Sequence, residues 1–237
     1  MKYQKELAAF LEKAGRDFSF DALAVRVLDP LGYMPYAAHK GLSPSFIEDE
    51  ELIAIDECIC GKVPRLDAQR TDTPFFTKRG SFWNNYLEEG VTEGLKKIGI
   101  EYRGRCLEEG YRTVLIIPVN ADNGNKGSLF FASRKENLLK NEDVEFLEDA
   151  ALRLGTNTFE HLTECERYNL KACWLAQNNG NDGAIFGKYF EHIKNCPACC
   201  ESNRPISEFD HTCKRVMAQG AASQELKSRI IRHLRSV

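Results

Sequence analysis

The chain has 237 residues, of which 43% are hydrophobic and 28% are charged, and its formal net charge is −3. These values predict a globular protein with a sizeable core, and they exclude a protein that coats nucleic acid over its whole surface. No apolar stretch approaches the roughly 20 residues that cross a bilayer, and the N-terminus lacks the apolar core of a secretion signal. We therefore expect a cytoplasmic protein that binds no membrane.

The first quarter of the chain predicts a helix, a strand hairpin and a second helix. Apolar residues at helical spacing run up to Gly15. A buried apolar run, a Pro-containing turn and a shorter apolar run then predict the hairpin. Ser43 before Pro44 is typical of a helix start, because serine caps the helix and proline fits its first turn. We place these elements at residues 1–15, 22–28, 33–39 and 43–55.

The next hundred residues predict an irregular helical middle, two confident strands and a long helix. The segment Cys58-Ile-Cys60-Gly61 reads as a loop that opens the middle part. The two strands are joined by a polar turn, and the helix carries an apolar stripe that extends to Leu162. This order predicts an α+β fold, an antiparallel sheet with helices on one side. The strands span 111–119 and 127–133, and the helix begins near Asn141.

The helical pattern gives way to polar sequence near residues 163–169, which is the best candidate for a domain boundary. We therefore predict an N-terminal helix, a central α+β domain and a small helical C-terminal module. These three parts span residues 1–17, 18–163 and 164–237.

A series of short motifs resembles the GAF sensory domain, in particular the cysteine-containing variety found with histidine kinases. The resemblance covers about residues 18–163 and implies an antiparallel sheet flanked by helices, with a pocket between the sheet and the irregular middle. Proteins of this family bind small ligands, cyclic nucleotides, haem, bilins or metal clusters, or only dimerise, so the family does not name the ligand. The motifs include Cys58-Ile-Cys60-Gly61, Pro74-Phe-Phe-Thr77, Gly80-Ser-Phe-Trp83, Arg105-Cys106, Gly110-Tyr111 and Leu115-Ile-Ile-Pro-Val119.

Three cysteines of this domain, Cys58, Cys60 and Cys106, form the first candidate site. On the family's layout they converge at the mouth of the pocket. Three thiols there could bind an iron–sulfur cluster or ligate haem, or form a reversible disulfide. A cluster normally needs four protein ligands and no clear fourth is present, which favours a redox pair or a small-molecule pocket. The alternative is that the thiols only pack in the core.

Other residues of the same domain are candidates for ligand contact. Trp83 and Tyr111 could line the pocket, although core packing is the more common role of such aromatic residues. Arg105, with Arg103 nearby, could hold an anionic ligand, or both could be solvated loop charges.

A second candidate site lies in the C-terminal module, where His192, Cys196 and Cys199 have the spacing of a zinc site. A histidine and a cysteine four residues apart share one helix face, and Cys-x-x-Cys brings two thiolates to one ion. Cys173 is the expected fourth ligand. The pattern resembles the zinc-binding anti-sigma fold, although the upstream spacing is shorter than usual here. The competing fourth ligands are Cys200, His211 and Cys213.

No motif of a known enzyme class is present, so we expect a non-catalytic regulatory protein. Its central domain would sense a small ligand or redox state, and its zinc module would contact a regulatory protein partner. The alternative is a structural adaptor whose central domain only forms a homodimer and whose zinc module binds a protein such as a sigma factor. A basic amphipathic helix over residues 223–237 could dock on a partner or pack on the module, while DNA binding would rest on charge alone.

Overall fold

The computed structural model describes residues 2–51, 53–65, 74–168 and 170, and also 188–189, 191–192, 195–197 and 199. The chain divides into two compact units, Met1–Arg167 and Tyr168–Val237. The predicted helical module at 164–237 lies mostly outside the described residues, and its boundary stays a prediction. In the described part, no helix combines the length and the apolar character that crossing a membrane requires.

Among the described residues, the first unit contains six labelled helices, five strands and two short 3-10 turns, and a further helical stretch, residues 164–168, begins at its end. The helices are α1 (Lys2–Phe18), α2 (Pro44–Glu50), α3 (Ile59–Lys62), α4 (Glu89–Lys97), α5 (Arg105–Glu108) and α6 (Asn141–Asn157). The strands are β1 (Ala22–Val27), β2 (Tyr36–Lys40), β3 (Phe82–Asn84), β4 (Thr113–Asn120) and β5 (Lys126–Ser133). The 3-10 turns are η1 (Val63–Arg65) and η3 (Phe159–His161).

The five strands form one antiparallel sheet in the order β2-β1-β5-β4-β3. The long central strands β4 and β5 pair along their whole length, from Thr113 with Ser133 to Asn120 with Lys126. In the outer pair of β1 and β2, the register shifts because Ala37 is an extra residue, which is a β-bulge. The α+β class with an antiparallel sheet is therefore confirmed.

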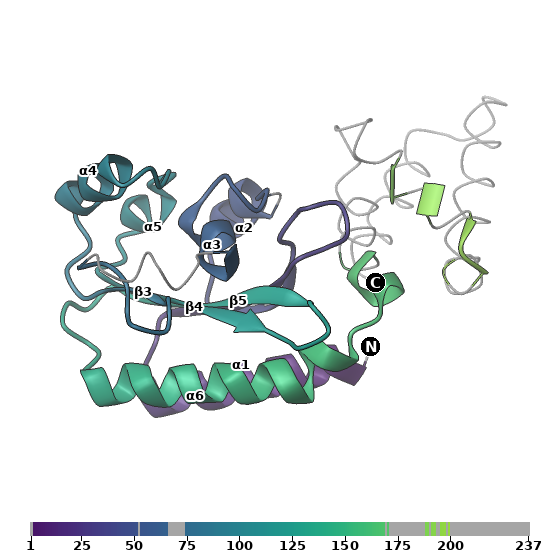
Figure 1. The fold of residues 1–237 in the computed structure, drawn as a ribbon. Coiled ribbons are helices and arrows are strands. Elements are labelled where there is room, and N and C mark those ends of the chain that lie inside the picture. Colours follow the sequence, from purple (N-terminus) through teal and green to yellow (C-terminus); the bar gives the residue numbers. More distant parts are fainter. Residues whose placement is uncertain are drawn as a thin grey trace, which may run out of the picture. The chain divides into compact units, whose positions relative to one another are not determined.

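Helices cover both faces of the sheet, whereas the element order alone predicted helices on one side. Figure 1 shows α1 and α6 side by side beneath the sheet and α2 to α5 above it. All six residues of β1 are buried, since each of its faces packs against a helical layer. The core cluster on the α2 to α5 side contains the alternate sheet residues Ala22, Ala24, Val114, Ile116, Phe130 and Ala132.

Three predicted helices have different ends in the structure, and one of them, α6, stops at Asn157, before the Leu162 that its predicted apolar stripe reached. Helix α1 continues through Gly15 to Phe18, and a side chain at Gly15 would touch the Leu23 side chain on β1. Helix α2 stops at Glu50 rather than near Ile55, because the backbone at 53–54 bridges to the segment before β2. The backbone N–H of Met34 donates to the carbonyl of Ile53 at 2.9 Å. Tertiary pairing thus overrides the local helical pattern.

Candidate functional sites

The three cysteines Cys58, Cys60 and Cys106 come together in the core between the sheet and the helices α2 to α5. Cys58 immediately precedes α3, Cys60 lies within that helix, and Cys106 lies in α5. Their side chains are 4%, 6% and 5% exposed, and none is bridged by a disulfide. The three thiols therefore lie in one buried core cluster, here called the thiol cluster, whereas the prediction placed them at the mouth of a pocket.

The residue after the second thiol explains why this segment folds as a short helix rather than as the predicted loop. A Cβ atom at Gly61 would lie 2.7 Å from the carbonyl oxygen of Ile55, closer than real Cβ contacts come. Glycine therefore lets α3 pack directly on the preceding backbone. The amide N–H groups of Gly61 and Lys62 both donate to the carbonyl of Cys58 at 3.0 Å, which closes the helical turn.

A fully buried arginine accompanies the thiol cluster. Arg26 on β1 is 1% exposed, and its guanidinium donates to the carbonyls of Met34 and Glu50, the latter at 2.7 Å. The same group lies over the Tyr36 ring, 3.7 Å from its centre. A buried cation is costly unless its donors are satisfied, and here two carbonyls and an aromatic face satisfy it. Arg26 thus places a positive charge inside the core close to the thiols.

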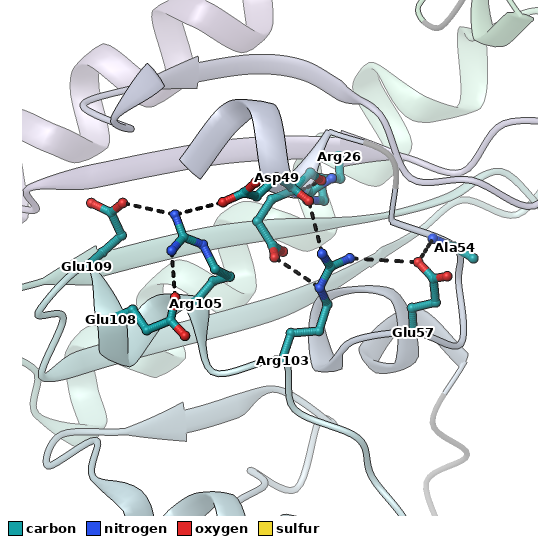
Figure 2. Close-up of polar contacts among 9 residues, drawn as sticks. Arg26, Asp49, Ala54, Glu57, Arg103, Arg105, Glu108 and Glu109 are labelled. Carbon is teal, nitrogen blue, oxygen red and sulfur yellow. Dashed lines mark hydrogen bonds and ion pairs between the residues drawn. The ribbon is translucent and has the colours of Figure 1, made fainter. Parts of the chain in front are cut away.

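The predicted anion-binding arginines are paired with carboxylates of the protein (Figure 2). Arg105 forms ion pairs with Asp49 at 3.1 Å, with Glu108 at 2.6 Å and with Glu109 at 3.5 Å. The Nε atom of Arg103 lies 3.3 Å from the buried carboxylate of Glu50. Neighbouring carboxylates therefore neutralise both arginines, which disfavours the anion-binding interpretation of Arg105.

Within the thiol cluster, the pKa of Cys58 is lowered, while the pKa values of Cys60 and Cys106 are raised. The pKa of Cys58 is lowered to about 6, because the Cys60 thiol donates to its sulfur. The backbone N–H groups of Cys60 and Arg103 and the charge of Arg26 also lower the pKa of Cys58. The same hydrogen bond, together with burial, raises the pKa of Cys60, and burial raises the pKa of Cys106. Cys58 is therefore the most acidic of the three thiols and the one most readily ionised to a thiolate.

Glu50 is the titratable carboxyl group beside this thiolate. Burial raises its pKa to about 7, and the charge of Cys58 adds to the shift while Arg103 and Arg26 oppose it. The folded protein therefore binds a proton at Glu50 over a pH range in which the unfolded chain has already lost it. Stability from this group is fully present below its ordinary pKa and is lost as the pH rises towards about 7.

The Glu50→Gln variant should therefore show a flatter dependence of unfolding free energy on pH, because it lacks this titration. Urea unfolding at a series of pH values between the ordinary pKa and neutrality measures the difference. The control is Glu57→Gln, since the exposed Glu57 lies 3.9 Å from the same arginine, Arg103. If Glu50→Gln loses as much stability over this range as the parent chain, the assigned titration is wrong.

The two predicted aromatic site residues lie on different sides of the sheet. Tyr111 is fully buried in the core cluster with the thiols, with its ring centre 6.1 Å from that of Phe46. Trp83 pairs with Leu115, while its neighbour Phe82 pairs with Ile116 of the core cluster. Because side chains alternate along a strand, Trp83 faces the opposite layer. The structure therefore does not bring Trp83 to the thiols.

A second cluster contains Cys165, His192, Cys196 and Cys199 and could hold a metal ion. Their ligand atoms all lie within 4.8 Å of one another. No other group of three or more such side chains with this geometry occurs among the residues the structure describes, so the thiol cluster does not form one.

Helical geometry places three of the four groups of this metal-ligand cluster. The amide N–H of Cys196 donates to the carbonyl of His192 at 2.9 Å, which sets these residues one helical turn apart on one face. The Nε2 atom of His192 lies 3.4 Å from the sulfur of Cys199. The His192 ring stacks on Tyr168, with their centres 3.8 Å apart.

Cys165 is the member of this cluster that the sequence interpretation missed. It lies in the helical stretch 164–168, and Thr163 caps the start of this stretch. The Thr163 hydroxyl accepts a hydrogen bond from the amide N–H of Glu166, and the Glu166 carboxylate accepts one from the amide N–H of Thr163. The sequence held one signal for Cys165. The spacing from Cys173 to His192 is shorter than usual for this pattern, and Cys165, which lies eight residues before Cys173, gives a longer one. Cys173 and its competitors Cys200, His211 and Cys213 lie outside the described residues, so their roles stay predictions.

Comparison with known proteins gives distant structural similarities only. The sequence matches no family model and no curated protein. The GAF domain of a phosphoenolpyruvate-protein phosphotransferase from Coxiella burnetii is 17% identical, with 65% of this chain and 80% of that chain covered and a TM-score of 0.47. The type II free methionine-R-sulfoxide reductase from Thermoplasma acidophilum is 14% identical, with 65% and 89% covered and a TM-score of 0.47. Similarity at this level carries no information about the function of this chain.

Proposed function

We propose that the chain is a non-catalytic regulatory protein with two parts. Its N-terminal α+β domain receives a chemical signal, either a small ligand or a change of redox state, and its metal-binding C-terminal unit contacts a partner protein. The observation that carries this proposal is the thiol cluster with Arg26 and Glu50 in the core. Apolar side chains would fill that space at lower cost, and titratable groups with displaced pKa values gather preferentially at functional sites.

Buried polar atoms in the same layer support a site for a small polar molecule. The Tyr111 hydroxyl and the Ser128 hydroxyl are buried and have no hydrogen-bond partner among the described residues. Ser128 pairs with Arg26 across β1 and β5, on the side of the sheet that carries Ala24 and Phe130. Buried hydroxyl groups almost always find a partner, so a ligand or water that supplies one would fit here.

The signal-receiving role is tested on the whole protein purified without oxygen. Its melting temperature and its absorbance spectrum are recorded after reduction with dithiothreitol and after oxidation with hydrogen peroxide. We expect a shift that depends on the thiols and that disappears when Cys58, Cys60 and Cys106 are all replaced by serine. No thiol-dependent shift and no absorbance of haem or iron would rule out the redox and cofactor versions of the proposal.

The metal that best fits the second cluster is zinc. Three thiolates and one imidazole are a common donor set for a closed, four-coordinate structural zinc site. In a tetrahedral site a sulfur and a nitrogen ligand would be about 3.6 Å apart, from the usual bond lengths. The observed 3.4 Å between Cys199 Sγ and His192 Nε2 is close to this value. In this proposal the ion stabilises the unit that contacts the partner.

The alternative function, a dimerising adaptor, is supported by the outer helical layer. A groove of about 410 Å³ lies between α1 and α6, and apolar side chains from both helices line it. Phe146 and Leu152 on α6 are 49% and 66% exposed. The rim carries both acidic and basic groups, Glu6 and Asp17 with Lys13 and Arg153, so a second copy of the chain related by two-fold symmetry could match opposite charges.

Replacing both Phe146 and Leu152 with glutamate should convert a dimer of this kind into a monomer, because charges would enter an apolar contact. Sedimentation equilibrium of the parent and variant chains measures this change. Lys97→Glu on α4, on the other side of the sheet, is the control and should leave the association unchanged. A parent chain that is monomeric at all concentrations, or a variant that stays dimeric, would contradict this interface.

A further inference from the structure

Aromatic side chains lie beside the metal-ligand cluster, and one of them contacts a ligand directly. The Tyr168 ring stacks on the His192 imidazole, with their centres 3.8 Å apart and their planes inclined by 16°. The Tyr189 ring meets Tyr168 edge-on, with centres 5.9 Å apart and an angle of 85° between the planes. Tyr189 is 1% exposed, so its surroundings fix it in place. The three rings, all in the second unit, therefore form a continuous contact that ends on a metal ligand.

The spacing of these residues along the chain explains the contact. Tyr189 and His192 are both helical and three residues apart, and Cys165 and Tyr168 are three residues apart in the helical stretch 164–168. Side chains three positions apart share one face of a helix. Each tyrosine therefore lies on the same helix face as one of the candidate metal ligands.

Stacking on Tyr168 restricts the orientation of the His192 imidazole. A histidine side chain can rotate about two bonds, and a metal ion is bound only in the plane of the ring, where the nitrogen lone pair lies. Metal-binding histidines usually have an outer partner that fixes this plane. With the ring held against Tyr168, Nε2 lies 3.4 Å from the sulfur of Cys199. Nε2 is therefore the nitrogen placed to bind the ion.

The stack also favours the metal-bound form of the histidine. A bound metal ion withdraws electron density from the imidazole and gives the ring partial positive charge. The face of a phenol ring is electron-rich and attracts positive charge. The attraction between Tyr168 and His192 is therefore stronger when the imidazole holds a metal, and this difference adds to the affinity of the site.

We propose that Tyr168 is a positioning residue for the metal site, because it holds the His192 imidazole in the orientation that binds the ion through Nε2. This inference rests on the proposed zinc site and names a residue that sets its affinity and geometry. Loss of the outer partner of a metal-binding histidine costs about 10- to 100-fold in metal affinity. We expect about 10-fold for Tyr168, at the lower end of this range, since the contact that is lost is aromatic stacking.

Cobalt binding to the full-length, reduced chain tests the inference. Co²⁺ takes the same ligands as zinc, and its d–d absorption bands report how the donor atoms are arranged around it. Tyr168→Leu should bind cobalt about 10-fold more weakly in competition with a chelator, and its d–d bands should shift even at saturating cobalt. Tyr168→Phe keeps the aromatic face and should restore both properties. Tyr86→Leu is the matched control, because Tyr86 is 55% exposed and belongs to the first unit.

The saturated spectrum distinguishes positioning of the histidine from a merely structural role of Tyr168. Weaker binding of Tyr168→Leu with an unchanged saturated spectrum would overturn the inference, and so would affinity and spectrum equal to those of the parent; both results leave the zinc site standing. In ¹⁵N spectra of the zinc-loaded parent chain, we expect His192 to carry its proton on Nδ1, and a proton on Nε2 would contradict the assigned orientation. A parent chain that binds no cobalt would overturn the zinc site and this inference together.

Discussion

Replacing Cys196 with serine is expected to remove the metal from the cluster of Cys165, His192, Cys196 and Cys199 and to unfold the second unit selectively. Serine cannot supply the thiolate that completes the cluster with His192 and Cys199. Structural zinc contributes about 10–16 kcal/mol of apparent folding free energy in small zinc modules, far more than a unit of this size can lose and remain folded. Metal content by mass spectrometry and limited proteolysis measure the two effects. We expect no bound zinc and rapid cleavage after residue 168.

The N-terminal domain provides the internal control for this prediction. Its fragment, residues 1–167, should resist protease in the Cys196→Ser chain as it does in the parent chain. Cys106→Ser, which alters a buried cysteine of the first unit, should keep the zinc. Retention of one zinc per chain by Cys196→Ser would show that the cluster is not the metal site. The Cys165→Ser and Cys173→Ser variants, compared in the same assay, would identify the fourth ligand.

Replacing Arg26 with methionine is expected to give the largest loss of stability in the first unit. Methionine fills much of the volume but leaves the carbonyls of Met34 and Glu50 without the guanidinium donor. A buried acceptor that loses its partner costs about 1–3 kcal/mol, so two cost about 2–6 kcal/mol. Loss of the contact with the Tyr36 ring adds to this cost. Urea unfolding of the reduced protein, followed by circular dichroism, measures the decrease.

An exposed arginine is the matched control for this substitution. Arg16→Met, in the last turn of α1, should change the unfolding free energy by about 0.5 kcal/mol or less, as surface substitutions usually do. Arg26→Lys should fall between the two, because lysine keeps the charge but cannot reach two carbonyls with a planar fork. An Arg26→Met chain that unfolds at the same urea concentration as the parent would show that the buried cation does not stabilise the fold.

Strands with strong local signals could be predicted from the sequence, and elements that depend on tertiary contacts could not. The apolar runs of β4 and β5 and the turn between them set those strands to within two residues of the prediction. The three-residue strand β3 carries too little pattern, and it exists because Phe82 and its neighbours pair with β4. The end of α2 was also missed, since distant backbone pairing at Ala54 decides it.

The features of the candidate sites also divide into those that the sequence could predict and those that depend on tertiary contacts. The clustering of Cys58, Cys60 and Cys106 followed from the resemblance to a known family, and the structure places them in one core. The side of the sheet on which Trp83 lies, and the carboxylates that pair with Arg105, depend on register and on loops far apart in sequence. No local spacing could have revealed the buried role of Arg26 either, because a charged residue in a strand usually marks an exposed face.

The complete burial of β1 limits how this domain can vary. Its alternate residues point to opposite faces of the sheet. Arg26 lies on the face with the polar groups of the thiol cluster, while Val25 and Val27 face the layer of α1 and α6. An insertion or deletion of one residue within the strand would exchange these environments and drive the guanidinium into a wholly hydrocarbon space. Length changes should therefore be tolerated at the edge, where β2 already accommodates the additional residue Ala37, and not in β1 itself.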